Sequence, residues 1–142
     1  YAALCSGLAL ANSGLGAVHG FAGPIGGMFS APHGAICARL LPFVLKANHQ
    51  ALNARSEDNP SVLRFQELAQ MLTGQANAKG VDGITLIREL CLEFDIAPLR
   101  TYGIQQSNLP LIVEKAQKAS SMKGNPIPLR DEELSEILIE AL

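Results

Sequence analysis

Residues 14–42 read GLGAVHGFAGPIGGMFSAPHGAICARLLP and contain two of the three histidines of the chain, His19 and His33. The stretch is rich in glycine and proline, a composition typical of loops. It is nevertheless poor in the serine, asparagine and aspartate of a solvated loop, and it carries large apolar side chains instead. Apolar, glycine-rich backbone suits close packing against other backbone or against a ligand. The sequence therefore predicts that this segment lies inside the molecule.

The spacing of His19 and His33 predicts a hairpin if the two side chains share a metal ion. On one straight helix, 14 residues span about 21 Å, whereas a metal–nitrogen bond is only about 2.0–2.1 Å long. Glycine and proline at positions 23–27 are expected to end a first helix, and residues 30–32 to open a second, with His33 in its first turn. The alternative is two partly buried histidines, each hydrogen-bonded to a backbone carbonyl.

The remaining segments show the apolar spacing of helices rather than the alternation of strands. Helices are expected over residues 1–12, 35–48, 61–73, 82–95, 107–119 and 130–142. The fold class is therefore all-α, a helical bundle of about six to eight helices forming one domain over residues 1–142.

Several local features refine this expectation. The helix over 1–12 is so apolar that burial on nearly all sides is expected, and Pro42 is expected to kink the helix over 35–48. Residues 49–60 turn polar and predict a surface loop, with His49 exposed to solvent. Asn59 or the serine at 61 suits the cap of the next helix, and Gly74 suits its end.

Composition limits the partners of the chain. The charged fraction is 17%, the hydrophobic fraction 48% and the net charge −2. Soluble domains average about 25% charged residues, so part of this surface is expected to be apolar and to pack against a neighbour. The chain has no cluster of Lys and Arg residues, so nucleic-acid binding is not expected. No apolar stretch reaches the roughly 18 residues of a membrane span.

The cysteines and the start of the chain point to the cytoplasm and to a longer protein. Cys5, Cys37 and Cys91 are odd in number and form no CxxC pattern, so they are interpreted as reduced, buried small hydrophobes. The chain begins inside an apolar helical pattern, with no initiating Met and no basic leader segment. A cytoplasmic location is expected, and the chain is expected to be a fragment of a larger protein.

Residues 14–42 resemble the signature of iron-containing (group III) alcohol dehydrogenases, which belong to the dehydroquinate synthase-like superfamily. The positions that match are Gly16, His19, Pro24, Gly26, Pro32, His33, Gly34, Leu40, Leu41 and Pro42. Residues 120–129, followed by an acidic amphipathic helix, also resemble the usual ending of that family. The resemblance covers essentially the whole chain but only the C-terminal, all-helical half of a complete enzyme.

The resemblance implies a metal-dependent NAD(P) alcohol dehydrogenase. The family binds NAD or NADP mainly through an N-terminal Rossmann-like domain and holds a divalent metal in the cleft between its domains. The metal is expected to be Fe²⁺, with Zn²⁺ as an alternative. The implied ligands are an Asp and a His from a helix upstream of residue 1, together with His19 and His33. The metal acts as a Lewis acid on an alcohol or aldehyde oxygen.

The same resemblance implies the partners of the chain. They are its own N-terminal nucleotide-binding domain, a small alcohol or aldehyde, and further copies in a homo-oligomer, without nucleic acid or membrane. Because the cofactor domain and two implied metal ligands lie outside these residues, the chain alone is expected to be inactive and to bind metal weakly.

The candidate substrate pocket is less specific. Gly23 stands where the family commonly has a second histidine, which is a departure from its pattern. Ser121 and Asn125 match a loop that approaches the site in the family. The alternative for that loop is a helix cap at Gly124 and a turn at Asn125. No catalytic residue is assigned.

Other functions remain open at this stage. The chain could belong to a maleylacetate-reductase-like, glycerol-dehydrogenase-like or dehydroquinate-synthase-like branch of the superfamily. A different class of function is a freestanding helical module for interaction or oligomerisation. The sequence leaves open the substrate, the choice between NAD and NADP, and the identity of the metal.

Overall fold

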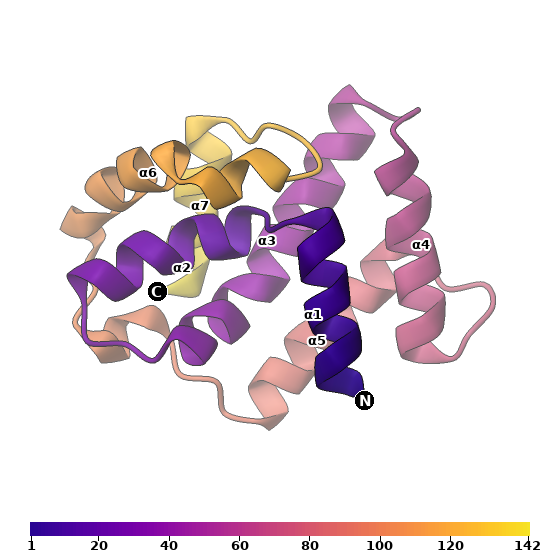
Figure 1. Cartoon of the computed structure of the whole chain (residues 1–142), viewed down its shortest axis with the longest axis horizontal. Helices are drawn as coiled ribbons and strands as arrows, with labels where there is room; N and C mark the ends of the chain where they lie inside the picture. The colour runs from indigo at the N-terminus through magenta and orange to yellow at the C-terminus, as the bar shows by residue number, and fades with distance from the viewer.

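The computed structural model describes residues 1–142 and contains seven α-helices and three short 3-10 helices, with no strand (Figure 1). The all-α fold class predicted from the sequence is confirmed. None of the helices has both the length and the apolar character needed to cross a bilayer. The elements in chain order are α1 (Ala2–Ser13), α2 (Ala17–Met28), α3 (His33–Arg55), α4 (Pro60–Thr73), α5 (Gly80–Glu93), η1 (Leu99–Tyr102), η2 (Gln106–Asn108), α6 (Leu109–Lys118), η3 (Ser120–Gly124) and α7 (Asp131–Ala141).

Helices α2 and α3 form the predicted hairpin, and His33 is the first residue of α3. The expected break at residues 23–27 is wrong, because α2 continues through Pro24 to residue 28. Proline removes one backbone donor from a helix, but most helix stability in proteins comes from packing of an apolar face. Here Phe21 and Ile25 are completely buried on either side of Pro24, and their packing maintains the helix.

Helix α3 is longer than the sequence indicates. It runs through Pro42 without interruption and ends at residue 55. The predicted polar loop at its C-terminal end is therefore helical as far as residue 55. Ala51 and Leu52 are buried within this stretch, so two apolar residues are enough to extend the packed face of the helix beyond the polar residues around them.

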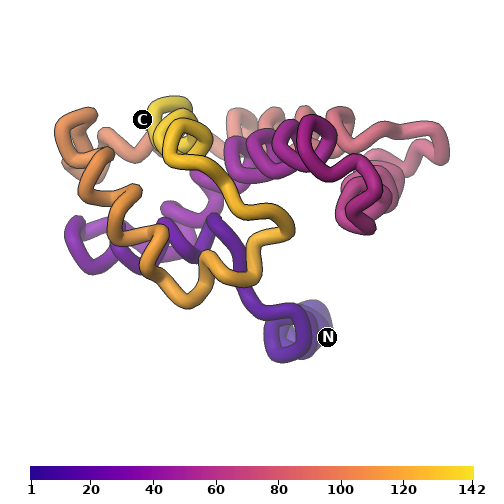
Figure 2. Tube along the Cα trace, turned by 90° about the horizontal axis from the view of Figure 1, so that it is seen from above, coloured from indigo at the N-terminus to yellow at the C-terminus, as the bar shows by residue number.

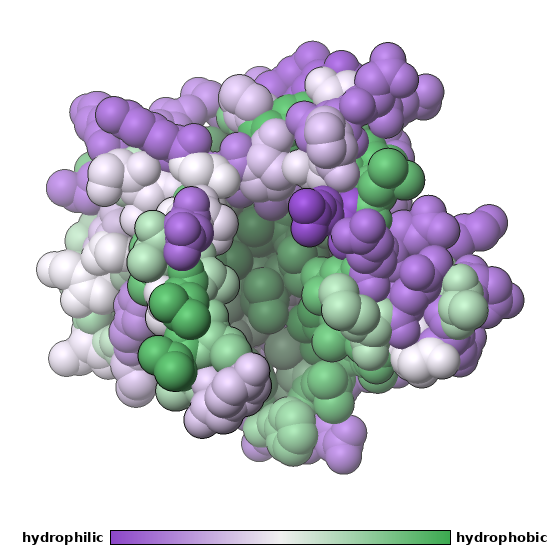
Figure 3. Space-filling view, turned by 45° about the vertical axis from the view of Figure 1, so that its right-hand side comes forward, coloured by the Kyte–Doolittle hydropathy of each residue, from purple (hydrophilic) through white to green (hydrophobic).

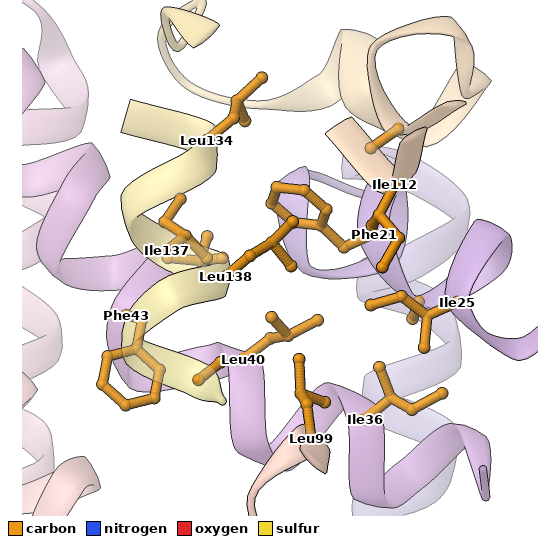
Figure 4. Close-up of a cluster of buried hydrophobic side chains, with 14 of the residues drawn as sticks. Phe21, Ile25, Ile36, Leu40, Phe43, Leu99, Ile112, Leu134, Ile137 and Leu138 are labelled. Carbon is orange, nitrogen blue, oxygen red and sulfur yellow. The ribbon is translucent and has the colours of Figure 1, made fainter. Parts of the chain in front are cut away.

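The main core joins α2 and α3 to α6 and α7. Its completely buried side chains include Phe21 and Ile25 from α2, Leu40 from α3 and Leu138 from α7. Figure 4 shows these side chains and their neighbours meeting in one cluster. Full burial of one such side chain stabilises the folded state by about 1.5–3 kcal/mol. The cluster therefore fixes the relative positions of α2 and α3, the helices that carry His19 and His33.

Helices α4 and α5 pack beside the C-terminal half of α3. Gly83 of α5 lies against Ala69 of α4, where an added Cβ would be only 2.9 Å from Ala69 Cα. The predicted ends of α4 are confirmed, because Asn59 Oδ1 accepts a hydrogen bond from the Ser61 amide at 2.9 Å. Gly74 ends the helix with a φ of 70°. Phe65 of α4 lines the cavity described below.

Helix α1 stands apart from the rest of the molecule (Figure 2). None of its residues is buried, so the expectation that it would be buried on nearly all sides is wrong for this chain. Leu4, Leu8 and Leu10 are exposed. The helix is apolar as predicted, but no other element of these 142 residues covers it.

Candidate metal centre

Two helices supply three side chains to one cluster. His19 is the third residue of α2, and His33 is the first residue of α3. Cys37 follows His33 by four residues, and residues at this spacing share one face of a helix. His33 is exposed, whereas His19 and Cys37 are half-buried. The cluster therefore lies near the surface, where the first turns of α2 and α3 meet.

The distances within the cluster are short. Cys37 Sγ lies 3.5 Å from His33 Nε2 and 3.9 Å from His19 Nε2. The two imidazole centroids are 5.3 Å apart, with their planes inclined at 48°. The potential ligand atoms of the three residues all lie within 4.8 Å of one another. This arrangement has the donor types and the spacing of a site for a single metal ion.

The hydrogen bonds of the two histidines do not fit a purely structural role. The only hydrogen-bond contact of each imidazole is with Cys37 Sγ, and neither reaches a backbone carbonyl. The alternative of two core histidines bonded to carbonyls is therefore not what the structure shows. Burial raises the pKa of the Cys37 thiol.

A pair of asparagines fixes the start of α2. The N-cap of α2 is a glycine and has no capping side chain of its own. Asn125 Oδ1 takes this role by accepting a hydrogen bond from the Ala17 amide at 3.1 Å. Asn125 also exchanges two hydrogen bonds with Asn48 of α3, at 3.1 and 2.7 Å. These contacts link α2, α3 and the segment after η3. The linked residue of α2, Ala17, lies two residues before His19.

A cavity of about 540 Å³ opens beside this cluster. His19, Cys37 and Asn125 line it together with mostly apolar side chains, including Val44 and Phe65. Figure 3 shows this face of the molecule as a deep hollow with a hydrophobic floor. The arrangement places His19 and Cys37, side chains of types that can bind metal, at the edge of a space that suits the carbon skeleton of a small organic molecule.

A family model described as "Fe-containing alcohol dehydrogenase family, C-terminal" matches residues 1–142. The chain belongs to this family. The resemblance inferred from residues 14–42 is thereby confirmed, and the match extends over all the elements described above. The α2–α3 hairpin and the helices that support it are thus the C-terminal domain of the family.

Named relatives agree with this assignment. The 1,3-propanediol dehydrogenase of Klebsiella pneumoniae is 31% identical over 99% of this chain and 36% of the relative. The NADPH-dependent butanol dehydrogenase of Clostridium saccharobutylicum is 32% identical over 96% of this chain and 35% of the relative. A crystal structure of 1,3-propanediol oxidoreductase matches with a TM-score of 0.80 at 27% identity, over 100% of this chain and 36% of that one. The chain thus spans about a third of the length of these dehydrogenases.

The structure brings some of the predicted site residues together and leaves others apart. His19 and His33 meet in the cluster, and Asn125 lines the adjacent cavity. Gly23 is exposed, with open space where a Cβ would be added, and it does not line the cavity. Ser121 is half-buried in η3 and also lies outside the cavity lining. Assigning these residues to a substrate pocket remains a prediction.

The cysteine interpretation is partly wrong. All three cysteines are free, as expected. None, however, is a fully buried hydrophobe, because Cys5 is exposed while Cys37 and Cys91 are half-buried. Cys37 instead contacts both histidines. Its spacing of four residues from His33, once both were assigned to one helix, was the available signal.

His49 is also not a residue of a solvated loop. It lies within α3 and is half-buried, with its ring centroid 5.5 Å from that of Phe65. Burial lowers the pKa of His49. The polar neighbours of His49 in the sequence suggested a loop, whereas the helix continues past them. His49 lies outside the metal cluster.

Proposed function

We propose that this chain is the metal-binding domain of an NAD(P)-dependent alcohol dehydrogenase, which transfers hydride between an alcohol or aldehyde and the nicotinamide. His19 and His33 bind the divalent ion in this proposal. One observation carries it: imidazoles from two helices of a family domain meet at one point beside an apolar cavity.

The side chains present suit such an ion. Neutral imidazole nitrogen is a ligand for iron and zinc alike, and the ligand atoms of the cluster are close enough to share one centre. When bound, the ion supplies Lewis acidity toward the oxygen of the substrate. The residues of this chain hold the ion between the first turns of α2 and α3, and the cavity accepts the apolar part of the substrate and excludes water from it.

The rest of the enzyme is part of the same proposal. NAD or NADP is bound mainly by a nucleotide-binding domain outside these residues, and the enzyme is a homo-oligomer. The family description favours Fe²⁺, with Zn²⁺ as the alternative. Names such as propanediol and butanol dehydrogenase among the relatives support a short alcohol as substrate. Free thiols fit a reducing, cytoplasmic location.

Substitution of the histidines tests this function in a protein that joins this chain to its nucleotide-binding domain. His19→Ala or His33→Ala should remove bound metal and abolish turnover, while NAD(P)H binding persists, because the imidazoles hold the ion and not the dinucleotide. His49→Ala is the matched control, since His49 lies outside the cluster. Assayed at a temperature at which it is folded, this variant should keep its metal and most of its turnover. Normal turnover and metal content in either cluster variant would contradict the proposal.

A further inference from the structure

A second cavity, of about 330 Å³, lies between α3, α5 and α7. This α3–α5–α7 cavity shares no residue with the metal cluster or with the cavity beside that cluster. Its charged lining residues are Arg39 and Lys46 of α3, Arg88 of α5 and Glu140 of α7. These cations are far apart in the sequence and meet only in the fold. Three positive charges and one negative charge give the cavity a net charge of +2, in a chain whose net charge is −2.

Only one of the three cations has a counter-charge within the chain. Lys46 Nζ lies 2.5 Å from Glu140 Oε1. Arg39 donates hydrogen bonds to the backbone carbonyls of Ala141 and Glu140, which carry no charge. The side chain of Arg88 is exposed and belongs to none of the ion pairs of the chain. Two guanidinium groups therefore line the cavity without a carboxylate to neutralise them.

The arginine side chains around this cavity are close enough to affect one another. Burial lowers the pKa of Arg39, and repulsion from Arg100 and Arg88 adds to this effect. A bound anion relieves such repulsion. Guanidinium groups bind the oxygens of phosphate and carboxylate through paired N–H donors. Arg39 uses two of its five N–H groups on α7, so others remain for a ligand.

We propose that the α3–α5–α7 cavity binds a small organic phosphate, whose phosphate group contacts Arg39 and Arg88. A phosphate monoester has a charge of about −1.5 to −2 at neutral pH, which matches the charge of the cavity. A single carboxylate supplies only half of that charge. This site goes beyond the proposed dehydrogenase function and does not depend on it.

The uncharged part of the lining suits the organic portion of such a ligand. Pro42, Phe43 and Leu92 are the apolar side chains of the cavity. Its volume lies within the range of about 300–1,000 Å³ that is usual for small-molecule sites. A ligand held by Arg39 and Arg88 connects α5 to α3, so it should also raise the stability of the folded chain in proportion to its occupancy.

Isothermal titration calorimetry with phenyl phosphate tests the inference on the 142-residue chain, which contains the whole cavity and its supporting core. One molecule should bind per chain, and the affinity should fall as salt is added, because the cavity is open to screening. Phenol, which has the same ring without the phosphate, should not bind. Saturable binding that is absent at millimolar phenyl phosphate would overturn the inference.

Two arginine variants locate the binding site. Arg88→Met should weaken phenyl phosphate binding about tenfold or more, because it removes charge-assisted hydrogen bonds to the phosphate. The variant should fold normally, since Arg88 has no ion pair to lose. Arg64→Met is the matched control, because it removes the same charge from an exposed side chain of α4 that lies 3.8 Å from Glu67. It should keep the affinity of the parent chain. Equal affinities of Arg88→Met and Arg64→Met would contradict the assignment of the site.

Alkylation of the cysteines provides a second measurement that needs no variant. Cys91 lines the cavity, whereas Cys5 is exposed on α1. Saturating phenyl phosphate should slow the reaction of Cys91 with iodoacetamide and leave that of Cys5 unchanged, as measured by peptide mass spectrometry. An unchanged rate at Cys91 would show that the probe binds elsewhere and would overturn the inference. None of these results affects the proposed metal site, because the cluster contains no residue of this cavity.

Discussion

His49 is a titratable side chain held against apolar neighbours. Its ring contacts Phe65, and a Cβ added at Gly80 would lie 2.8 Å from its Nε2 atom. Burial lowers the pKa of His49 in the folded state below the ordinary value of 6.5. Between the folded-state pKa and 6.5, the unfolded chain binds more protons than the folded chain. The free energy of unfolding therefore falls as the pH drops.

The predicted loss begins as the pH drops through 6.5 and levels off below the folded-state pKa of His49. Urea unfolding between neutral and mildly acidic pH measures it. His49→Gln removes the titrating group, and the slope in this window should be shallower than in the parent chain. Identical slopes in the two proteins would show that His49 does not cause the effect.

Two glycines predict opposite responses to the same substitution. A Cβ on Gly124 would lie 2.0 Å from the carbonyl oxygen of Leu15, whereas a Cβ on Gly23 meets nothing within 4 Å. Gly124→Ala should therefore destabilise the fold by about 3 kcal/mol through overpacking. Gly23→Ala should stabilise it by about 0.5–1 kcal/mol, because alanine is favoured within an exposed helix. Chemical denaturation compares them, and equal effects would refute the predicted close contact at Gly124.

At the scale of elements, the hydrogen bonds of Asn125 connect three segments. Asn125→Ala leaves the Ala17 amide without its acceptor and removes both partners of the buried Asn48 amide. A loss of about 1–3 kcal/mol in stability is expected from the unpaired groups. Zinc affinity should fall as well, because the first turn of α2 carries His19.

The control for this prediction is Asn12→Ala. Asn12 donates a hydrogen bond to Leu8 within the exposed helix α1, and surface changes of this kind usually alter stability by less than about 0.5 kcal/mol. Calorimetry and zinc titration on both variants provide the measurements. Equal behaviour of the two variants would show that Asn125 has no special role.

The sequence predicts the elements whose signals are local. The Asn59 cap and Gly74 end of α4 depend on neighbouring residues only, and both are found as expected. The continuation of α2 through Pro24 depends instead on burial of Phe21 and Ile25 in a core built with α6 and α7. Analysis of one segment at a time detects the proline but not the packing that compensates for it.

The same difference between local signals and long-range packing applies to the residues of the metal cluster. His19 and His33 could be found from their motif, and their convergence required only a turn between two helices. Cys37 was missed because three isolated cysteines carry no spacing signal among themselves. Its role depends on the position of α3 beside α2. Asn48 was missed for a similar reason, since its partner Asn125 lies 77 residues away in the sequence.

At the scale of the whole molecule, α1 differs from every other α-helix. It has 12 residues and none is buried. An isolated helix of this length is marginal in water, so backbone amides of residues 2–13 should exchange with deuterium much faster than those of α2 and α3. Hydrogen-exchange mass spectrometry measures this difference. Slow exchange in α1 would show that another surface, such as a second copy of the chain, covers it in solution.

The cap of α2 sets an order of events during synthesis of the protein. The acceptor for the Ala17 amide is 108 residues further along the chain, and ribosomes release the N-terminal part first. A nascent chain that ends before residue 125 has both histidines but lacks the side chain that secures the helix bearing His19. Metal retention should therefore arise only when almost the entire chain has emerged, and arrested shorter chains should lose the ion to a chelator.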